Sequence, residues 1–327
     1  MIKPELPHNE AERTRTLEDM GVIYSPSEAR FDRITRLVTR HFGVSTCLIS
    51  MLYKEIQWFK SLQGLNTCST DREISFCGHA ILQNDALVVE NALLDPRFMD
   101  NPLVLDAPRI RFYAGHPVRD QFGMVLGTLC IIDGTPRAFS QEDRQDLQDF
   151  ARLVEAEIAK PSEDSVVSRF VRALSENQRA LLIDPMVGSW NSRGFEALLA
   201  KEMEFAASRG ETLGLVKATL QSFDGIEARF GRDRLVDFSK FTAAVMRDTL
   251  PDSASLGSLG ANCFVAVLPH TDRNATASLV DRLKKKFETL VLETHGVKAL
   301  VDVDVQFVTF DKNNLPRSAQ AALTVLQ

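Results

Sequence analysis

The sequence predicts two domains of mixed α and β structure, α/β or α+β, each with a sheet covered by helices. The chain has 327 residues, or roughly two domains at about 150 residues each. Segments with the 3.6-residue period of helices alternate with short apolar runs typical of strands. Lys160-Pro161 interrupts a helical pattern near the middle of the chain. Because proline has no amide hydrogen to continue a helix, we place the domain boundary there.

The first half is predicted to contain two helices, a set of strands and a closing helix. Helical patterns cover residues 9–20 and 28–41, with Ser27 as the N-cap of the second. Ser140 should cap the closing helix, which extends to about Ala159, because carboxylates in its first turn favour the helix dipole. Strand-like runs lie between them, at residues 45–52, 56–61, 86–89, 111–115 and 124–132.

Residues 159–183 are predicted to form a helical connector. A short heptad seam repeats there at spacings of four and three, and its members are Val167, Val171, Leu174, Gln178 and Leu181. This seam favours a homodimer through residues 164–183. It spans only about two heptads and includes a glutamine, so an amphipathic helix packed on its own domain is the alternative interpretation.

The second half alternates helices and strands along its whole length. Helices are expected at 192–209, 223–230, 233–250 and 274–292, and strands at 213–220, 254–259, 263–268 and 300–310, before a short last helix. Interleaved elements of this kind predict helices that cover a sheet.

Composition excludes several classes of function. The 38 basic and 44 acidic residues give a net charge of -6, so no electrostatic footprint for a polyanion is present and nucleic acid is not expected as a partner. No run approaches the roughly 18 apolar residues of a membrane-spanning helix, and the first residues lack the apolar core of a secretion signal. We expect a cytoplasmic protein that does not bind membranes.

The five cysteines are an odd number at wide spacings, without a C-x-x-C pair. Free thiols are therefore expected. A zinc site needs two close pairs of cysteine or histidine, and the close pair that involves a cysteine is Cys77 with His79. We expect no metal and no cofactor.

Seven short segments of the first half follow one another in the order found in one family of sensor domains. They are Asn9-Glu10-Ala11-Glu12-Arg13, Phe31-Asp32-Arg33, Gln57-Trp58-Phe59-Lys60-Ser61, Ser75-Phe76-Cys77-Gly78-His79-Ala80, Asp95-Pro96-Arg97-Phe98-Met99-Asp100-Asn101-Pro102, Ile110-Arg111-Phe112-Tyr113-Ala114-Gly115 and Leu126-Gly127-Thr128-Leu129-Cys130. Residues 9–158 thus resemble a GAF domain of bacterial signalling proteins. The resemblance implies a central antiparallel sheet flanked by helices. It also implies a pocket that in relatives holds a cyclic nucleotide, a chromophore or a small metabolite, or stays empty.

The resemblance places four candidate ligand-binding side chains near this pocket: Cys77, His79, Arg111 and Tyr113. An arginine can bind an anion, an aromatic side chain can contact a ring, and a histidine is a donor that responds to pH. Alternatively Cys77 and Tyr113 belong to the core, and Arg111 pairs with Asp95 or Asp133. A redox role for Cys77 requires a lowered thiol pKa, which sequence does not show.

Two signatures in the second half resemble those of diguanylate cyclases. Residues 184–195, Asp-Pro-Met-Val-Gly-Ser-Trp-Asn-Ser-Arg-Gly-Phe, resemble the opening D-P-L-T-G-L-x-N-R-R-x-F, and residues 259–264 stand where a family member reads L-G-G-D-E-F. Residues 184–327 therefore resemble a GGDEF domain. The resemblance implies a nucleotidyl-cyclase-like sheet covered by helices, and an activity that condenses two GTP molecules into cyclic di-GMP.

The departures from this pattern affect the metal-binding residues. The hairpin signature is degenerate and consists of Gly260, Ala261, Asn262, Cys263 and Phe264, so the acidic pair is replaced. Thr219 and Gln221 stand at the two aspartates of the family's D-x-D strand. Phosphoryl transfer requires carboxylates that hold Mg²⁺ against the phosphates. We therefore predict that no residue is catalytic and that the domain is a pseudo-enzyme.

A residual nucleotide site is the last candidate. Glu227 stands where the family reads guanine with an asparagine, and its carboxylate can still accept a hydrogen bond. Asn191 belongs to the adjoining loop. The sequence thus predicts a cytoplasmic signalling protein whose GAF domain senses a small ligand or a partner protein, and whose inactive GGDEF-like domain gives a binding output. The alternatives are an active diguanylate cyclase with atypical metal ligands and a dimerisation scaffold.

Overall fold

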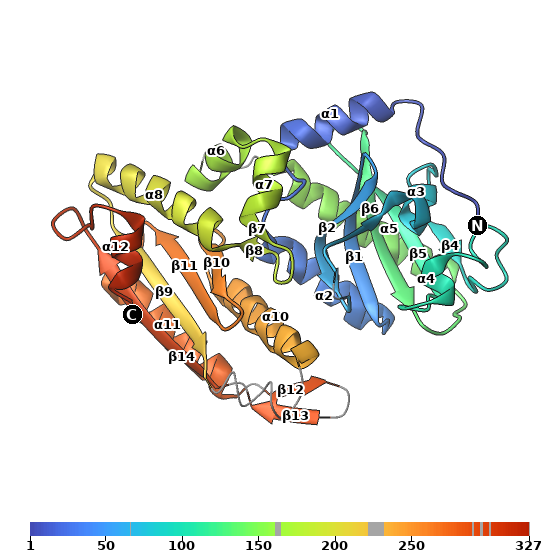
Figure 1. Cartoon of the computed structure of the whole chain (residues 1–327). Helices are drawn as coiled ribbons and strands as arrows, with labels where there is room; N and C mark the ends of the chain where they lie inside the picture. Colours follow the sequence, from blue (N-terminus) through green and yellow to red (C-terminus); the bar gives the residue numbers. More distant parts are fainter. Residues whose placement is uncertain are drawn as a thin grey trace. The chain divides into compact units, whose positions relative to one another are not determined.

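The computed structural model describes residues 1–65, 67–160, 165–221, 232–289, 291–294, 297–300 and 302–326. The chain divides into two compact units, Met1–Ser162 and Glu163–Gln327 (Figure 1). Each unit has its own six-stranded sheet and its own apolar core. The prediction of two domains that each pair a sheet with helices is confirmed.

The sheet of the first unit is antiparallel throughout, in the order β3-β2-β1-β6-β5-β4. Its strands are β1 (Thr46–Tyr53), β2 (Ile56–Gln63), β3 (Ser69–Asp71), β4 (Leu87–Val89), β5 (Phe112–Arg119) and β6 (Val125–Asp133). The long central strands β1 and β6 are almost fully buried, because helices cover both of their faces. The fifth strand extends four residues beyond the predicted run at 111–115.

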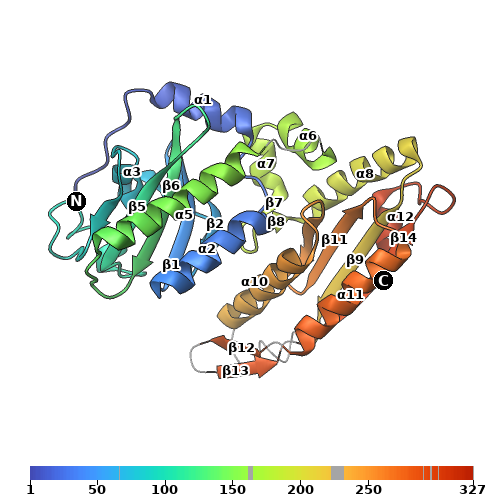
Figure 2. The same cartoon turned by 180° about the vertical axis from the view of Figure 1, so that it is seen from behind.

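Helices α2 (Ala29–Phe42) and α5 (Gln141–Ala159) cover one face of this sheet, and the short helices α3 (Phe76–Ala80) and α4 (Pro102–Leu105) lie on the other (Figures 1 and 2). Helix α1 (Glu10–Met20) contacts β6. Ser140 is the N-cap of α5, as predicted, and it forms a capping box with Asp143. The N-cap of α2 is Glu28 rather than Ser27, and it makes no side-chain cap hydrogen bond.

The second unit has a mixed sheet in the order β14-β9-β11-β10-β8-β7. Its strands are β7 (Ile183–Asp184), β8 (Ser189–Trp190), β9 (Leu213–Leu220), β10 (Ser255–Gly260), β11 (Cys263–Pro269) and β14 (Val303–Phe310). The pair β8 and β10 is parallel, and the remaining pairs are antiparallel. The predicted strands at 213–220 and 263–268 are confirmed within one residue.

Helices α10 (Arg232–Thr249) and α11 (Arg273–Glu288) pack on the face of this sheet that holds the main core. Helix α8 (Ser192–Arg209) contacts β10 and the last helix, α12 (Ala319–Thr324). A separate hairpin joins β12 (Val291–Thr294) to β13 (Val297–Leu300). The predicted helix to Leu292 was too long, because α11 ends at Glu288 and β12 begins at Val291.

The heptad seam predicted that its five residues lie on one helix of the connector, and this prediction was wrong. Two short helices, α6 (Val166–Ala173) and α7 (Glu176–Leu182), replace that helix. Leu174 is extended, and Ser175 starts α7 with a capping box that occupies the Gln178 side chain. The side chains of the predicted seam thus do not share one helix. Both helices pack on α8 of their own unit, which agrees with the alternative interpretation. The homodimer stays a prediction.

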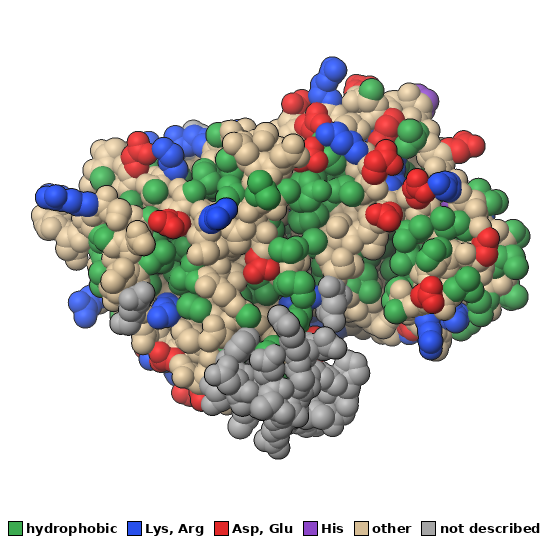
Figure 3. Space-filling view, viewed as in Figure 1, with side chains coloured by type: hydrophobic (Ala, Val, Ile, Leu, Met, Phe, Trp, Pro, Cys, Tyr) green, Lys and Arg blue, Asp and Glu red, His purple; other side chains and the backbone are tan. Residues whose placement is uncertain are grey.

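The distribution of surface charge and the character of the helices bear on the predictions for nucleic acid and membranes. On the face shown in Figure 3, acidic and basic side chains are interspersed on both units. In the parts of the chain that the structure describes, no helix combines the length and the apolar character needed to span a bilayer.

Candidate functional site

The hairpin between β10 and β11 carries the degenerate signature. Gly260 ends β10 with a φ of 147°, a conformation that a side chain disfavours. The Ser239 hydroxyl of α10 donates to the carbonyl of Ala261 at 2.5 Å, and the Leu220 amide donates to the carbonyl of Asn262 at 2.8 Å. The turn is therefore held between α10 and the end of β9.

The two predicted metal positions on β9 and β11 are neighbours across the sheet. Thr219 is the Cα partner of Cys263 on one side and of Asp304 on the other. Burial raises the pKa of the Cys263 thiol, against the opposing effects of Lys217 and of a hydrogen bond from Thr219. The Thr219 hydroxyl and the uncharged Cys263 thiol therefore face each other at two positions where the resemblance predicts carboxylates.

Gln221, the second position of the D-x-D strand, is exposed just beyond β9. Its backbone amide donates to the carbonyl of Asp302 at 2.9 Å. Across the described ranges, no group of three or more His, Cys, Asp or Glu side chains is arranged to hold a metal ion. Glu227, the predicted guanine-reading position, lies outside the described residues, as does the helix predicted at 223–230.

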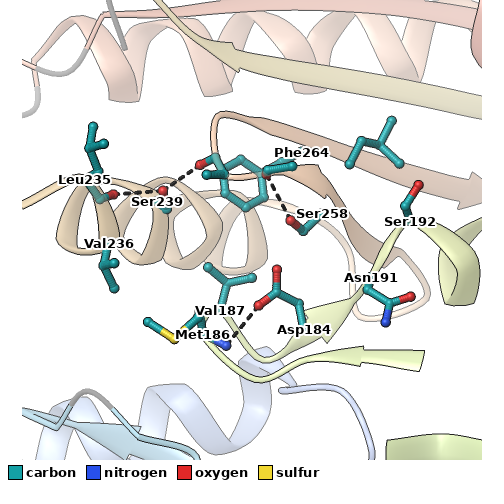
Figure 4. Close-up of a pocket in the computed structure, with 13 residues that line it drawn as sticks. Asp184, Met186, Val187, Asn191, Ser192, Leu235, Val236, Ser239, Ser258 and Phe264 are labelled. Carbon is teal, nitrogen blue, oxygen red and sulfur yellow. Dashed lines mark hydrogen bonds between the residues drawn. The ribbon is translucent and has the colours of Figure 1, made fainter. Parts of the chain in front are cut away.

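A cavity of about 540 Å³ lies beside the signature hairpin (Figure 4). Its lining comes from the 184–192 segment, α10 and the hairpin: Asp184, Met186, Val187, Asn191, Ser192, Leu235, Val236, Ser239, Ser258, Leu259, Gly260, Ala261 and Phe264. Asp184 is the one charged side chain among these described lining residues, and its carboxylate accepts a hydrogen bond from the Met186 amide at 2.9 Å. The other polar side chains of this wall are Asn191 and three serines, and its remaining residues are apolar or glycine.

Asn191 lines this cavity, but its amide group is used within the fold. The Oδ1 atom accepts a hydrogen bond from the Gly194 amide at 3.0 Å, and Nδ2 donates to the carbonyl of Leu181 at 2.8 Å. Asn191 is therefore the N-cap of α8. The cap therefore explains why an asparagine suits this position, and no role in nucleotide binding is needed to explain it.

In the first unit, the structure brings Cys77 and Tyr113 together. The Tyr113 hydroxyl donates to Cys77 Sγ at 3.3 Å, and Gln57 Nε2 donates to the same sulfur at 3.2 Å. The thiol of Cys130 on β6 lies 3.5 Å from that of Cys77. Gly115 makes room for this arrangement, because a Cβ there would lie 2.1 Å from the Tyr113 hydroxyl oxygen. All of these groups are buried.

The surroundings of Cys77 change its acidity. Burial raises the pKa of the Cys77 thiol, but hydrogen bonds from Cys130 and Tyr113, together with the nearby hydroxyls of Thr128 and Ser50, lower it to about 7. Burial raises the pKa of Cys130 and of Tyr113 well above their usual values. The lowered thiol pKa on which a redox role depends is therefore present at Cys77.

His79 is engaged away from the Cys77 sulfur. Its Nε2 atom lies 3.0 Å from the carbonyl oxygen of Ile2, and its ring packs edge-on against Phe98 with centroids 5.0 Å apart. Burial lowers the pKa of His79. The imidazole thus fixes the N-terminal segment to α3.

Arg111 is engaged with the backbone. It donates to the carbonyls of Val104 at 2.8 Å and Ile110 at 3.0 Å, which closes the end of α4. The predicted alternative of an ion pair with Asp95 or Asp133 was wrong. Those carboxylates pair with nearer arginines of their own loops, Arg97 and Arg137.

Sequence reasoning missed the polar neighbours of Cys77, which are Ser50, Gln57, Thr128 and Cys130. Ser50 and Thr128 are register partners on β1 and β6. Within the described chain, neither hydroxyl has a hydrogen bond of good geometry, although both are buried. Polar residues in the middle of two otherwise apolar strands were the available signal.

Comparisons with known proteins agree with both units. Residues 26–158 match the family model of the GAF domain, and residues 181–323 match the model described as diguanylate cyclase, GGDEF domain. The chain joins a GAF domain to a GGDEF domain. Helix α1 lies before the range matched by the GAF model. The signature hairpin and the cavity lie inside the GGDEF domain, and the Cys77 cluster lies inside the GAF domain.

One curated relative spans both domains. The chain is 31% identical over 296 residues to a protein named cyclic di-GMP phosphodiesterase from Pseudomonas aeruginosa. The match covers 89% of this chain and 47% of the relative. The chain thus spans about half the length of the curated relative it matches.

Two solved structures are similar to parts of the chain. The FimX GGDEF domain from Pseudomonas aeruginosa is 21% identical, with a TM-score of 0.42 over 44% of this chain and 88% of that one. The diguanylate cyclase SiaD, solved with its activator SiaC from the same organism, is 18% identical, with a TM-score of 0.39 over 57% and 71%.

Proposed function

We propose that this GGDEF domain makes no cyclic di-GMP and that the chain is a cytoplasmic regulatory protein of cyclic di-GMP signalling. The observation that carries the proposal is the Thr219–Cys263 pair. Phosphoryl transfer develops negative charge that metal ions held by carboxylates must neutralise. A hydroxyl and a thiol whose pKa is raised by burial supply no such charge.

In this proposal the GAF domain senses a small ligand or a partner protein, and the GGDEF domain answers by binding. A ligand shifts the protein between two states only by its difference in affinity for them, typically about 1–3 kcal/mol. Support for the pathway comes from the relative, whose name refers to cyclic di-GMP turnover. The domain boundaries in this proposal are 9–158 and 184–327, with 159–183 as the connector.

A second candidate, an active cyclase with atypical metal ligands, rests on one specific observation. Asp304 on β14 lies directly opposite Thr219, so a carboxylate is next to the position of the missing one. Its Oδ2 atom accepts a hydrogen bond from Gln306 Nε2 at 2.9 Å. A metal held there would use a ligand from β14 in place of β9.

The deciding experiment incubates the purified chain with GTP and either Mg²⁺ or Mn²⁺ and separates the products by chromatography. An active family member in the same buffer is the positive control. We expect no cyclic di-GMP above the level without protein. Product that disappears in Asp304→Asn but persists in Asp281→Asn, an exposed aspartate of α11, would overturn the proposal and establish the second candidate.

A further inference from the structure

We propose that Cys77 and Cys130 are a dithiol that a hydroperoxide oxidises to a disulfide inside the GAF domain. This inference is independent of the proposed function of the GGDEF domain. The two thiols come from segments 53 residues apart and lie 3.5 Å from each other. A disulfide has a sulfur–sulfur distance of about 2.05 Å, so closure requires a movement of about 1.5 Å.

The two cysteines differ in how freely their elements can move. Cys130 lies on β6, which pairs with β1 on one side and β5 on the other. Cys77 lies on α3, a single turn of five residues. Because α3 contacts the sheet through side chains, with no backbone hydrogen bond between them in the described part of the chain, we assign the closing movement to α3 and treat β6 as the fixed partner.

The hydrogen bonds around the sulfurs assign different roles to them. Tyr113 and Gln57 donate to Cys77 Sγ, and donors of this kind stabilise a thiolate. At Cys130 burial dominates and the thiol keeps its proton. Cys77 is therefore the attacking sulfur, and Cys130 is the thiol that resolves the intermediate.

The chemistry balances in two steps. The Cys77 thiolate attacks one peroxide oxygen, the sulfur–oxygen bond forms as the oxygen–oxygen bond breaks, and the leaving hydroxide or alkoxide takes up a proton. The Cys130 sulfur then attacks the resulting sulfenic acid, and hydroxide leaves with the Cys130 proton as water. Two thiols lose two electrons in total, and the peroxide is reduced to water or to an alcohol and water.

The N-terminal segment packs against α3, the helix that carries Cys77. Pro4 lies against Gly78, the residue next to Cys77, so closely that a Cβ on Gly78 would be 2.6 Å from the Pro4 ring. The Ile2 amide donates to the carbonyl of Arg97 at 3.1 Å, and the Ile2 carbonyl contacts His79. A small oxidant needs only a local opening of this segment, whereas bulky reagents need more.

Oxidation to the disulfide would change the hydrogen bonds in the core around Cys77. The disulfide removes the thiolate that accepts hydrogen bonds from Tyr113 and Gln57, and buried donors without an acceptor are unfavourable. The oxidised GAF domain therefore favours an arrangement of α3, β2 and β5 in which these two donors find other partners.

The test treats the reduced full chain with hydrogen peroxide and follows its intact mass and its free thiols. We expect a mass loss of about 2 Da and a peptide that links Cys77 to Cys130. In Cys130→Ser the reaction should stop at a sulfenic acid that dimedone traps on Cys77. Cys47→Ser is the matched control, because Cys47 is equally buried in the same sheet and should leave the linkage unchanged.

A second variant keeps the test decisive if a serine at either cysteine prevents folding. Tyr113→Phe removes one donor to Cys77 and leaves the ring in place. We expect disulfide formation to slow by about tenfold at pH 6, as a pKa rise of one unit lowers the thiolate fraction. Tyr53→Phe, whose hydroxyl contacts Glu18 instead, should react like the wild type. Equal rates for Tyr113→Phe and the wild type would overturn the proposal, as would a linkage through Cys68 or Cys263.

Discussion

Thr219 on β9 lies directly opposite Cys263 on β11, and its hydroxyl stabilises the thiolate form of that cysteine. Side chains at directly opposed strand positions have Cβ atoms about 5 Å apart. Two carboxylates at this distance repel each other unless a cation lies between them. The uncharged pair therefore lets this part of the sheet fold without a metal ion.

Restoring the carboxylates should make the GGDEF domain respond to metal. We expect Thr219→Asp with Cys263→Glu to lower the free energy of unfolding by about 1 kcal/mol without a metal, because like charges oppose each other across the strands. Millimolar Mg²⁺ should then raise the melting temperature of this variant. Thr219→Asn with Cys263→Gln is the uncharged control and should show no response to Mg²⁺. If Mg²⁺ did not raise the melting temperature of the charged variant either, the two positions would not be close enough to share a metal ion.

Asn191 should act as a helix cap rather than as a ligand-binding residue. We expect Asn191→Ala to destabilise the GGDEF domain by about 1 kcal/mol, because the first-turn amide of α8 loses its acceptor. Asn191→Asp keeps that acceptor and should retain most of the stability. Urea unfolding of both variants checks this. Equal stability of wild type and Asn191→Ala would show that the cap contributes little.

Glu10 should give the first unit, Met1–Ser162, a stability that depends on pH in the acid range. Its carboxylate, 19% exposed, binds Arg13 and Arg72 at 2.6 Å each. Burial opposes the charge, but these arginines hold the pKa of Glu10 at about 2. Because this lies below the unfolded value, the stabilisation is present above pH ~4.5 and is lost as the pH falls toward 2.

Glu10→Gln should therefore lower the stability at pH 7 by about 2 kcal/mol and flatten its dependence on pH in the acid range. Thermal unfolding between pH 3 and about pH 7 measures both effects. Glu12→Gln is a matched control, since Glu12 is exposed on the same helix. An unchanged acid slope in Glu10→Gln would refute the assignment.

Glu202 should have the opposite effect in the GGDEF domain. It is 3% exposed on α8, and burial raises its pKa to about 7 against the smaller opposing effect of Arg169. The folded state thus binds the proton more tightly than the unfolded state does. The stability this provides is present below pH ~4.5 and falls as the pH rises toward 7.

Glu202→Gln should remove this fall and raise the stability at pH 8 by about 2 kcal/mol, because no buried charge remains. Chemical unfolding at pH 5 and about pH 8 measures the difference between the two conditions. Glu204→Gln, an exposed position on the same helix, should change neither value by more than a few tenths of a kcal/mol. A Glu202→Gln variant that is less stable at pH 8 would show that the carboxylate has a stabilising role.

The sequence predicted those elements whose signal is local. Strands β1, β6, β9 and β11 are apolar runs bounded by turns, and α5 begins at a serine followed by carboxylates. The prediction of one helix in the connector failed because a heptad spacing does not show where a new helix begins. Ser175 and Gln178 form a capping box there, which starts α7. The two-residue strands β7 and β8 are too short to show any period.

The candidate sites divide in the same way. Alignment to a motif was enough to propose Thr219 and Cys263 as positions of lost metal ligands, and the two residues are register partners across β9 and β11. It was not enough for the Cys77 cluster, because Gln57 and Cys130 reach that sulfur through strand register, which joins distant segments. The partners of His79 and Arg111 also escaped prediction, since they come from the N-terminal segment and from α4. The role of these two residues in ligand binding stays a prediction.

Strand β5 carries Tyr113 toward α3 on one face, while its neighbour Phe112 is buried on the other, where α5 packs. Helix α5 has 19 residues and is therefore about 28 Å long. Helix α5 packs directly on β5. A displacement of β5 would therefore act on a stiff rod that ends at Ala159, one residue beyond the range matched by the GAF model.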